Sequence, residues 1–456
     1  MNNSFDSLKS LDGELLKTLQ KFGFSYMTEI QEKSLPFSLN GKDIIGKAKT
    51  GSGKTIAFSL PILNKLDVKK FDFQMIILAP TRELANQISD ELKQLAKFQH
   101  NIKILTLCGG VPYNPQVHSL RHKAHIIVGT PGRILKHLQN DNFSPKGINT
   151  LVLDEADRML DMGFSEDINA IISYIPKERQ TMLFSATYPS NIEKLSRDIL
   201  KDPVMVEVES EHTEDKIAQI FYESNEFDKT SIILKILDLY QPKSTIIFCN
   251  MKIECDNLAD ELERYDIYPL VLHSDLEQKD RDETIALFSN KSYKILIATD
   301  VASRGLDIDD VELVINYNLP KDLEVYTHRI GRTARAGKSG HAVSLIDGGD
   351  IGLFEDLTYQ SNSTLEPLPS KIDTQYDDTP LFKSIFINGG KKQKLSRGDI
   401  LGALTSGIGL DKNQVGKIDV KDLCSYVALD PKVAKRASID LGNNKIKGKF
   451  YRVYLK

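Results

Sequence analysis

The chain has few cysteines and no long apolar run, and each shortage excludes a class of protein. No apolar stretch approaches the ~18 residues that span a bilayer, and the first residues combine no basic region with an apolar run. The sequence therefore predicts neither a membrane span nor a secretory signal. No CxxC pair occurs, so we expect reduced, buried thiols in a cytoplasmic protein rather than disulfides or zinc ligands. The four cysteines are Cys108, Cys249, Cys255 and Cys424.

Length and apolar patterning indicate more than one folded domain. A hydrophobic content of 41% and a charged content of 27% are typical of soluble globular proteins, and 456 residues are too many for one ordinary core. From about Asp43 onward, short apolar runs alternate with amphipathic stretches, which is the pattern of parallel α/β sheets. The alternation breaks at a charged run over 207–216 and at a Ser-, Thr-, Pro- and Asp-rich stretch. We therefore predict α/β domains at 1–207 and 217–360, a linker at 361–380 and a small module at 381–456.

The small module lacks glutamate and is strongly basic. It has 13 Lys and 3 Arg against 6 Asp, a net charge of +10, although the whole chain has a net charge of −4. The remaining residues therefore carry a net charge of −14. A basic module on an acidic body indicates a polyanionic partner such as nucleic acid. A lysine-rich solvated surface would have the same composition, so charge alone does not decide between the two.

A glycine-rich run over 48–55, Ala-Lys-Thr-Gly-Ser-Gly-Lys-Thr, has the pattern of a phosphate-binding loop. Its glycines let backbone N–H groups turn inward onto phosphates at the start of the following helix. We expect Lys54 to reach the β- and γ-phosphates and Thr55 to ligate Mg²⁺. Ala48 stands where the pattern has glycine, and the loop alone could be a simple strand-to-helix turn. The residues expected to bind nucleotide are Thr50, Gly51, Ser52, Gly53, Lys54 and Thr55.

Two adjacent acids, Asp154 and Glu155, directly follow the apolar run Leu151-Val-Leu153. Adjacent acids often belong to a solvated loop. Here the aliphatic run places them at the carboxyl edge of a sheet, where parallel sheets bind their ligands. We expect Asp154 to hold Mg²⁺ through water, and Glu155 to orient and deprotonate the attacking water. The loop and the acids together predict hydrolysis of ATP or GTP.

The residues Asp154-Glu-Ala-Asp157 are the motif of the DEAD-box RNA helicases, and residues 1–355 resemble that family in the order of their motifs. The resemblance implies two tandem RecA-like parallel-sheet domains. The segment from Gly23 to Gln31 resembles the family's Q motif, which implies that Phe24 stacks on adenine and Gln31 hydrogen-bonds its edge. ATP is therefore the implied nucleotide. Without the resemblance, Gln31 is more simply an ordinary residue on a helix surface.

Further segments of the first domain resemble the family's RNA-backbone and coupling motifs. Backbone N–H groups at the starts of loops and helices, together with arginine side chains, can bind RNA phosphates without reading the bases. Ser185 and Thr187 resemble the motif that couples hydrolysis to strand separation. Taken singly, each of these segments could be only a helix cap or a turn. The RNA contacts implied in this domain are Arg82, Gly109, Gly110, Thr130, Gly132 and Arg133.

The second domain has no phosphate loop and no acid pair of its own, so its motifs imply a shared site. By resemblance, Arg332 and Arg335 would reach the γ-phosphate as arginine fingers, although a basic helix is more often a solvated face. Together with Lys54 and Glu155 they form the implied catalytic set. Hydrolysis would then require closure of the two domains, which RNA and ATP jointly favour. The other implied contacts are Gln278, Arg281 and Thr299 to RNA, and Gly305 and Asp307 to the nucleotide.

The basic module has strand-like runs at 385–387 and 426–429, and its pattern predicts an RRM-like α/β domain. Phe386 and Tyr426 could stack on RNA bases or belong to the core. The module resembles the RNA-binding domain of the bacterial DbpA-type helicases at 387–392, 398–404, 408–410 and 445–449. This resemblance implies binding to 23S rRNA and pre-50S particles, with the linker of about 20 residues acting as a tether. The lysines expected to contact RNA are Lys391, Lys392, Lys394 and Lys447.

Together these patterns predict an ATP-dependent RNA helicase that locally unwinds RNA duplexes during large-subunit (50S) assembly. ATP and Mg²⁺ are the expected cofactors, and neither DNA nor a membrane is expected as a partner. One alternative is an ATP-dependent RNA clamp of the same fold that does not unwind. Another is a DNA helicase or a different motor on the same tandem domains. The Q motif and the RRM-like module argue against this last alternative, which a preference for RNA over DNA would exclude.

Overall fold

A computed structural model of the chain describes residues 3–49, 51–208, 217–224, 228–300, 311–320, 323–334, 340–350, 352, 354–355, 357, 365–368 and 375–456. The chain divides into two compact units, Met1–Glu211 and His212–Lys456. The division falls inside the charged run at which the sequence predicts a break between domains. The residue limits predicted for the domains and the linker stay predictions.

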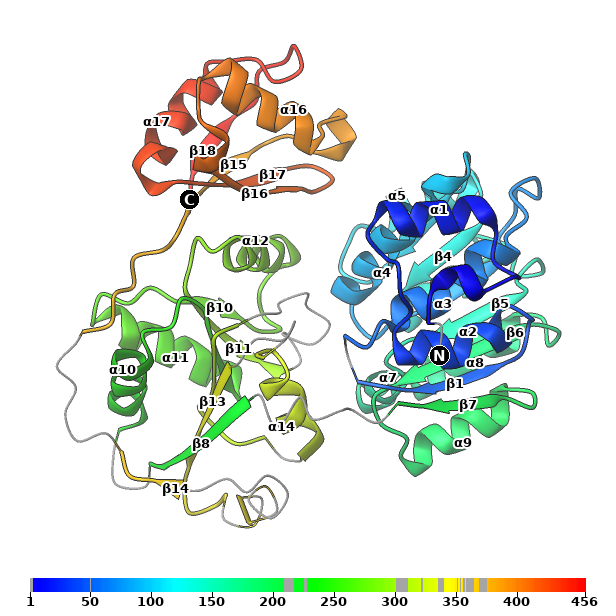
Figure 1. Ribbon diagram of the computed structural model, residues 1–456, viewed down its shortest axis with the longest axis horizontal. Coiled ribbons are helices and arrows are strands. Elements are labelled where there is room, and N and C mark those ends of the chain that lie inside the picture. The colour runs from blue at the N-terminus through cyan, green and yellow to red at the C-terminus, as the bar shows by residue number, and fades with distance from the viewer. Residues whose placement is uncertain are drawn as a thin grey trace. The chain divides into compact units, whose positions relative to one another are not determined.

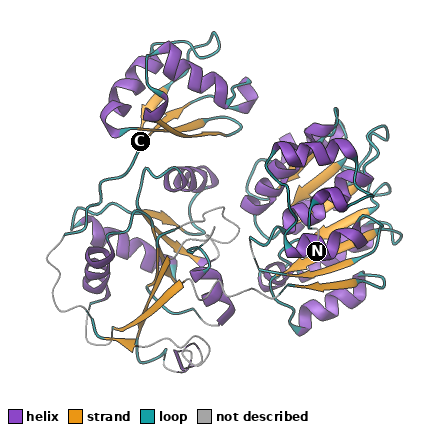
Figure 2. Ribbon diagram, viewed as in Figure 1, coloured by secondary structure: helices purple, strands orange, loops and turns teal. Residues whose placement is uncertain are grey.

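The first unit is built around a parallel sheet of seven strands in the order β3-β4-β2-β5-β6-β1-β7, with helices on both faces (Figures 1 and 2). Alternate residues of β2 enter two separate cores. Met75 and Ile77 pack in one core, and Ile76 and Leu78 in the other. This two-sided burial explains why the strands are continuous apolar runs. The strands are β1 Ile44–Lys47, β2 Met75–Leu78, β3 Ile104–Leu107, β4 Ile126–Gly129, β5 Thr150–Leu153, β6 Gln180–Ser185 and β7 Val204–Glu207.

Side-chain caps mark the start of several helices of this unit. The Asp12 carboxylate accepts the backbone N–H groups of Glu14 and Leu15, and α1 begins at the next residue, Gly13. The Thr81 hydroxyl caps α4 in the same way. The helices are α1 Gly13–Lys21, α2 Glu29–Ser38, α3 Lys54–Lys65, α4 Arg82–Leu95, α5 Tyr113–Arg121, α6 Pro131–Gln139, α7 Ala156–Asp161, α8 Ser165–Tyr174 and α9 Ser190–Ile199, with short turns η1 Phe5–Ser7 and η2 Ala96–Phe98.

The second unit contains another parallel sheet of seven strands, in the order β10-β11-β9-β12-β13-β8-β14. Its central strands are also buried on both sides, because Ile247 of β9 enters one core and Ile246 and Phe248 enter another. The strands are β8 Ile217–Glu223, β9 Thr245–Cys249, β10 Leu270–Leu272, β11 Ile295–Thr299, β12 Leu313–Asn316, β13 Gly340–Ile346 and β14 Leu365–Glu366. The described helices of this sheet's domain include α10 Lys229–Tyr240, α11 Lys252–Glu263, α12 Gln278–Ser289 and α14 Leu323–Ile330.

The same unit ends in a small antiparallel sheet in the order β16-β17-β15-β18, which we call the C-terminal domain. Ile385 of β15 pairs with Val427 of β17, and both side chains pack with the helices of this domain in one core. The predicted RRM-like α/β fold is therefore confirmed. The elements are β15 Lys383–Ile387, η4 Lys391–Gln393, α16 Arg397–Gly402, η5 Ala403–Gly407, η6 Lys412–Gln414, β16 Val415–Val420, β17 Ser425–Leu429, α17 Pro431–Gly442 and β18 Val453–Leu455.

The cysteines and the helices can be set against the expectations of reduced thiols and of no membrane span. All four cysteines are free thiols, and all but the half-buried Cys424 are buried. Burial raises the pKa of the Cys108 thiol to about 12, so this thiol is not poised for reaction. Among the described helices, none is both long and apolar enough to cross a membrane.

Candidate nucleotide and RNA site

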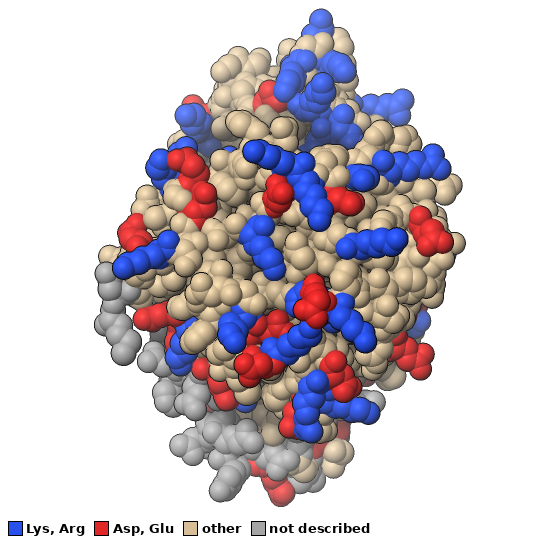
Figure 3. Space-filling model, turned by 90° about the vertical axis from the view of Figure 1, so that its right-hand side faces the viewer, with Lys and Arg blue, Asp and Glu red and all other residues tan. Residues whose placement is uncertain are grey.

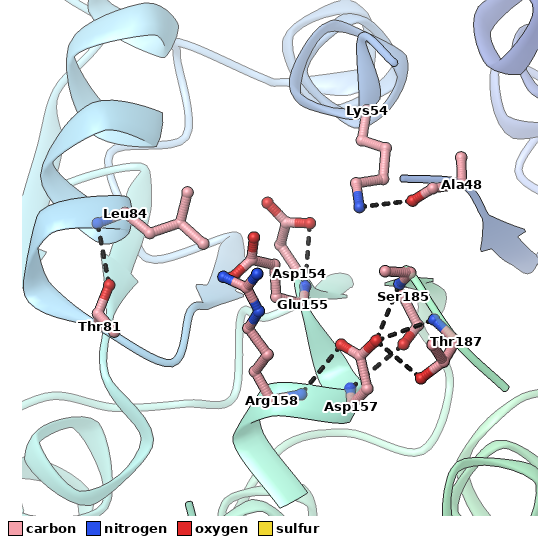
Figure 4. Close-up of polar contacts among 11 residues, drawn as sticks. Ala48, Lys54, Thr81, Leu84, Asp154, Glu155, Asp157, Arg158, Ser185 and Thr187 are labelled. Atoms are coloured by element: carbon pink, nitrogen blue, oxygen red, sulfur yellow. Dashed lines mark hydrogen bonds and ion pairs between the residues drawn. The ribbon is translucent and has the colours of Figure 1, made fainter. Parts of the chain in front are cut away.

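The phosphate-binding loop joins β1 to α3, and its backbone conformation depends on glycine. Gly51 and Gly53 have φ angles of +84° and +92°, in the left-handed region that favours glycine. The Lys54 side chain is buried and its amine donates to the Ala48 carbonyl at 2.8 Å (Figure 4). Ser52 Oγ is buried and has no hydrogen-bond partner among the described residues, which fits a loop built for an added ligand. The loop therefore has the conformation and the cation that a phosphate group needs.

Gln31 connects the first turn of α2 to this loop. Its side chain is only 2% exposed, and its Nε2 donates to the Gly53 carbonyl at 3.0 Å while its Oε1 accepts the Thr28 N–H at 3.0 Å. A side chain at Gly53 would clash with Gln31 and Thr28. The alternative of an ordinary helix-surface residue is therefore wrong for Gln31. Phe24 is 41% exposed, and its stacking on adenine stays a prediction.

The two acids follow β5 and are buried, so the alternative of a solvated acidic loop is wrong. Asp154 is 3% exposed and Glu155 is 4% exposed. Burial raises the pKa of the Asp154 carboxyl to about 7, although Lys54 opposes this shift. Glu155 has a φ of +53°, and its carboxylate accepts a hydrogen bond from Arg158 at 2.9 Å (Figure 4). A strained, buried carboxylate beside a second one is typical of a functional site.

Asp157 joins the acidic turn to the Ser185–Thr187 segment. One carboxylate oxygen accepts the backbone N–H of Ala186 at 3.0 Å and the N–H and hydroxyl of Thr187 at 2.9 and 3.1 Å. The Asp157 N–H donates to the Ser185 hydroxyl at 3.3 Å (Figure 4). Burial would raise the pKa of Asp157, but the hydrogen bonds from Thr187 and Ser185 outweigh it and the pKa lies below its usual range. The predicted coupling segment is thus held directly by the acidic motif.

The three segments predicted to contact the RNA backbone lie close together in the first unit. The Arg82 guanidinium packs over Gly110 and fills the space of a side chain there, and the Gly110 φ of +64° lies in the left-handed region that favours glycine. Gly109 donates its N–H to the Thr130 hydroxyl at 3.3 Å. Arg133 donates to the Val111 carbonyl at 3.1 Å, so the start of α6 is tied to the loop after β3. These segments are more than separate caps and turns, because their side chains bond to one another.

Gln116 and Asp157 are site residues that the sequence reasoning did not single out. Gln116 Oε1 accepts from Arg133 at 2.9 Å and lies 3.0 Å from His137 Nε2, and its own amide donates to the Cys108 carbonyl at 3.0 Å. Gln116 therefore fixes the position of Arg133. No local pattern signals this role, because its partners lie in α6 and in the loop after β3, both outside its own helix. Asp157 could have been found, since it is the fourth residue of the recognised motif.

In the second unit, Gln278 and Arg281 lie in the first turn of α12. Gln278 donates to Asp282 at 2.8 Å and Arg281 to the His273 carbonyl at 3.3 Å. Thr299 is the last residue of β11. The two side chains of α12 are thus held at one helix start, and their contact with RNA stays a prediction.

Of the arginines near the end of α14, Arg329 holds the domain together. It is 1% exposed, and its guanidinium bonds both Asp300 oxygens at 2.7 Å and Asn316 at 3.2 Å. Arg332 is 5% exposed, so a solvated basic face is the wrong interpretation for both side chains. Its role as an arginine finger stays a prediction. The expected site residues Thr50, Gly305, Asp307 and Arg335 lie outside the described residues.

The four lysines expected to contact RNA are exposed on the C-terminal domain. Lys447 donates to the Lys394 carbonyl at 2.8 Å and to Asp399 at 3.0 Å, so the loops carrying Lys394 and Lys447 lie side by side. Lys391 and Lys392 lie in η4, just before Lys394. Figure 3 shows Lys and Arg side chains gathered at the top of its view, with few acids among them. The contact between Lys447 and Lys394, and the position of Lys391 and Lys392 just before Lys394, bring the four expected lysines onto adjacent loops.

Comparison with known proteins decides the family. The chain matches the family models "DEAD/DEAH box helicase" over residues 28–195, "Helicase conserved C-terminal domain" over 228–337 and "DbpA RNA binding domain" over 384–455. The chain belongs to the DEAD-box RNA helicases. Its C-terminal domain marks it as DbpA-like, and it is an ATP-dependent RNA helicase by family.

Individual relatives agree with this assignment. The chain is 46% identical over 456 residues to the ATP-dependent RNA helicase DbpA of Escherichia coli (strain K12), covering 99% of both chains. It is 41% identical to the DEAD-box ATP-dependent RNA helicase CshA of Geobacillus kaustophilus (strain HTA426), over 80% of this chain and 78% of that protein. Among solved structures, S. cerevisiae Dbp5 bound to RNA and ADP BeF3 matches with a TM-score of 0.71 and 31% identity, over 80% of this chain and 96% of that one.

Of the two aromatic residues that could stack on RNA bases or belong to the core, Tyr426 belongs to the core. Tyr426 is 1% exposed and packs in a small cluster with Ala286 and Leu287 of α12, so it is a core residue. Phe386 is half-buried beside the same cluster. The tyrosine that could have stacked on RNA bases is therefore enclosed by protein.

Proposed function

We propose that this DEAD-box helicase uses ATP and Mg²⁺ to separate short RNA duplexes locally, and that its C-terminal domain recruits it to 23S rRNA in pre-50S particles in the cytoplasm. The observation that carries the proposal is the hydrogen-bonded connection between Asp157 and the Ser185–Thr187 segment. Through this connection, a change at the buried acids can reach a segment that, by family resemblance, acts on RNA.

The nucleotide would be held by residues of the first unit. Phe24 and Gln31 contact adenine, and Gly51, Gly53 and Lys54 contact the phosphates. Thr55 and Asp154 would hold Mg²⁺, which would neutralise charge on the phosphates when bound. Among the described residues, no group of three or more His, Cys, Asp or Glu side chains could hold a metal by itself. This fits Mg²⁺, which usually binds through one or two carboxylates together with substrate phosphates.

The reaction that this arrangement supports is hydrolysis of the γ-phosphate by water. Glu155, fixed by Arg158 at 2.9 Å, orients the water and takes its proton. Lys54 stabilises charge on the phosphates, and Arg332 and Arg335 would do so from the second domain. Because these groups belong to different domains, turnover requires closure, and RNA that favours closure accelerates hydrolysis.

RNA would be bound through its backbone by both domains of the core. The cluster around Arg82, Gly110 and Arg133 in the first domain offers guanidinium and N–H donors to phosphates. Gln278, Arg281 and Thr299 would hold the same strand in the second domain. The exposed lysines of the C-terminal domain would add binding energy through phosphate contacts that depend on salt.

ATPase rates test this proposal. Three conditions are compared: no RNA, an unrelated structured RNA, and a 23S rRNA fragment at equal concentration. We expect strong stimulation by the ribosomal fragment, and no turnover above background in Lys54→Ala under any condition. Equal stimulation by both RNAs would contradict recruitment to 23S rRNA and leave a general RNA helicase. A Lys54→Ala variant with normal turnover would contradict the nucleotide site.

A further inference from the structure

Uncharged groups surround Arg133, the residue of α6 that is expected to contact the RNA backbone. Arg133 Nη1 donates to Gln116 Oε1 at 2.9 Å and to the Val111 carbonyl at 3.1 Å. Its guanidinium carbon lies 5.6 Å from the centre of the Tyr113 ring. Among the residues that the structure describes, Arg133 forms no ion pair. Its partners therefore hold the guanidinium in place and leave its positive charge uncompensated.

Lys136 places a second cation beside the same aromatic ring. It follows Arg133 by three residues on α6, so the two side chains lie on one side of the helix. Lys136 is exposed, and its Nζ lies 5.3 Å from the centre of the Tyr113 ring. Within the described part of the chain Lys136 also forms no ion pair. The ring attracts both cations without cancelling their charge.

His137 stacks on the Tyr113 ring and is neutral. The two ring centres are 4.4 Å apart, and the ring planes are 6° from parallel. His137 Nε2 lies 3.0 Å from Gln116 Oε1, which only accepts, and His137 Nδ1 lies 3.2 Å from Asn142 Nδ2, which only donates. A neutral imidazole with its proton on Nε2 satisfies both contacts. Burial and the two nearby cations of α6 lower the pKa of His137 to about 4, which agrees with this form.

Further hydrogen bonds tie these side chains to one another and to the backbone. Gln116 Nε2 donates to the Cys108 carbonyl at 3.0 Å, and Asn142 Nδ2 donates to the Tyr113 hydroxyl at 2.6 Å. Gln116 and His137 are only 8% and 0% exposed. A buried network of satisfied hydrogen bonds is rigid, so Gln116 Oε1 stays directed at the guanidinium of α6.

The neutrality of this network bears on RNA binding. A carboxylate at position 116 would hold the Arg133 guanidinium more strongly than an amide, but it would also cancel its charge. RNA affinity depends on positive charge that is free to neutralise phosphates and release their counterions. An amide acceptor and an aromatic ring fix the position of a cation and keep its charge available.

We propose that Tyr113, Gln116 and His137 form an uncharged cradle that presents Arg133 and Lys136 together to the RNA backbone. Lys136 is then a further phosphate-binding residue of the first domain, three residues beyond the last one that the motifs imply. Gln116 and His137 are positioning residues, because they act on RNA through Arg133. The inference rests on the proposed function, since it takes Arg133 to contact RNA.

The salt dependence of RNA binding tests Lys136, because it counts the phosphates that the protein neutralises. The affinity of the full chain for a short single-stranded RNA is measured with ADP and beryllium fluoride over a range of salt concentrations. The logarithm of the affinity falls with the logarithm of the salt concentration by about 0.7 for each phosphate neutralised. We expect Lys136→Met to lower the affinity about three- to ten-fold and to make this slope shallower by about 0.7.

Lys177→Met is the matched control for the loss of one positive charge. Lys177 is exposed and lies just before β6, at the amino edge of the sheet, away from the edge that carries the site. This variant should change neither the affinity nor the slope. A Lys136→Met variant that behaves like Lys177→Met would overturn Lys136 as a phosphate contact.

Gln116→Glu tests the uncharged cradle with almost no change in shape. Because the new carboxylate would pair with Arg133, we expect RNA affinity to fall by about five-fold or more and the salt slope to become shallower by about 0.7. The change should lie in the RNA concentration that gives the half-maximal ATPase rate, rather than in the rate at saturating RNA. Gln139→Glu adds the same charge at an exposed position of α6 and should lower affinity by less than about two-fold.

A double-mutant cycle shows whether Gln116 acts through Arg133. In an Arg133→Met background, Gln116→Glu should lower RNA affinity by less than about two-fold, because the guanidinium that it would neutralise is absent. Equal losses with and without Arg133 would overturn the cradle, since the new carboxylate would then act on RNA by itself.

A conservative pair of variants tests the aromatic ring. Tyr113→Leu removes the ring beside both cations and should lower RNA affinity by about three-fold. Tyr113→Phe keeps the ring and its stack on His137, and it should lower affinity by less than about two-fold. Equal losses in the two variants would contradict the role of the ring.

Arg133→Met separates this inference from the proposed function. If Arg133→Met leaves both RNA affinity and the salt slope unchanged, the RNA contact that the proposed function gives to Arg133 is wrong. If Arg133→Met weakens binding while Lys136→Met and Gln116→Glu do not, the proposed function stands and the cradle is wrong.

Discussion

The two RecA-like domains have parallel sheets of seven strands, but they use the carboxyl edges of these sheets differently. In the first domain, Lys54, Asp154 and Glu155 are buried there beside the glycine-rich loop. In the second domain, the buried charge of Arg329 is fully engaged by Asp300, Asn316 and neighbouring groups. The comparison teaches that one edge gathers buried charges of both signs beside a loop shaped for phosphate, whereas the other uses a buried charge to hold strands together.

The largest expected effect comes from changing one of the buried charged residues of the first domain. Glu155→Gln removes the carboxylate that we propose takes the proton from water, and general-base catalysis contributes about 10²–10⁴-fold. We expect the RNA-stimulated ATP hydrolysis rate to fall by at least about 100-fold, with RNA binding retained. Glu166→Gln, an exposed acid on α8, is the matched control and should hydrolyse ATP normally. Turnover near that of the unmodified protein in Glu155→Gln would remove Glu155 as the base.

The corresponding change in the second domain should affect folding rather than chemistry. Arg329→Ala leaves the Asp300 carboxylate without its partner, and breaking a buried pair costs about 3–5 kcal/mol of unfolding free energy. Denaturant unfolding of the variant measures this loss. Arg264→Ala breaks an exposed pair with Glu261 and should cost less than about 1 kcal/mol. Similar losses in both variants would show that Arg329 is not the structural centre of the domain.

A smaller effect is expected where the first domain joins its acids to the coupling segment. Asp157→Asn replaces a carboxylate that accepts four hydrogen bonds, three on one oxygen and one from the Arg158 N–H on the other, with an amide that has a single acceptor oxygen. We expect about ten-fold less duplex displaced per ATP hydrolysed, because a hydrogen bond to a charged group contributes about 1.5–3 kcal/mol. The exposed Asp198→Asn is the control. If displacement per ATP is unchanged in Asp157→Asn, this connection does not carry the coupling.

The smallest effect concerns a strained residue of the second domain. Ala334 has a φ of +56°, and the left-handed region costs a non-glycine residue about 1–2 kcal/mol. We expect Ala334→Gly to raise the free energy of unfolding by up to about 1 kcal/mol, after the loss of a buried methyl group and the flexibility of glycine are subtracted. Ala259→Gly, inside α11, should lower it by about 1 kcal/mol. A loss of similar size at both positions would show that the Ala334 backbone is not strained.

Local patterns in the sequence were enough for the strands, and they also mark the residues that we propose bind the nucleotide. The apolar runs at 75–79, 125–128 and 244–249 coincide with β2, β4 and β9 to within a residue, because strands buried on both faces must be apolar throughout. The glycines and acids of the nucleotide site are recognisable, because phosphate and metal chemistry allows few alternatives at each position.

Contacts between distant segments could not be predicted in this way. The contact between α12 and the small sheet joins residues such as Glu283 and Tyr426, which are 143 positions apart. The same limit applies to Gln31, since nothing in its own helix indicates that it bonds the Gly53 carbonyl 22 residues later. Hydrogen bonds that position a side chain depend on which distant segments meet in the fold. A local sequence pattern does not show these meetings.

The central claim is that ATP hydrolysis in the first domain separates RNA strands next to a ribosomal target, and strand displacement tests it most directly. A labelled strand is paired to RNA that extends from the 23S rRNA fragment, and its release is followed with ATP, with ADP and with Glu155→Gln. We predict release with ATP alone, and only in the protein with an intact Glu155. ATP hydrolysis that the fragment stimulates without any release of the strand would contradict the claim and favour an RNA clamp.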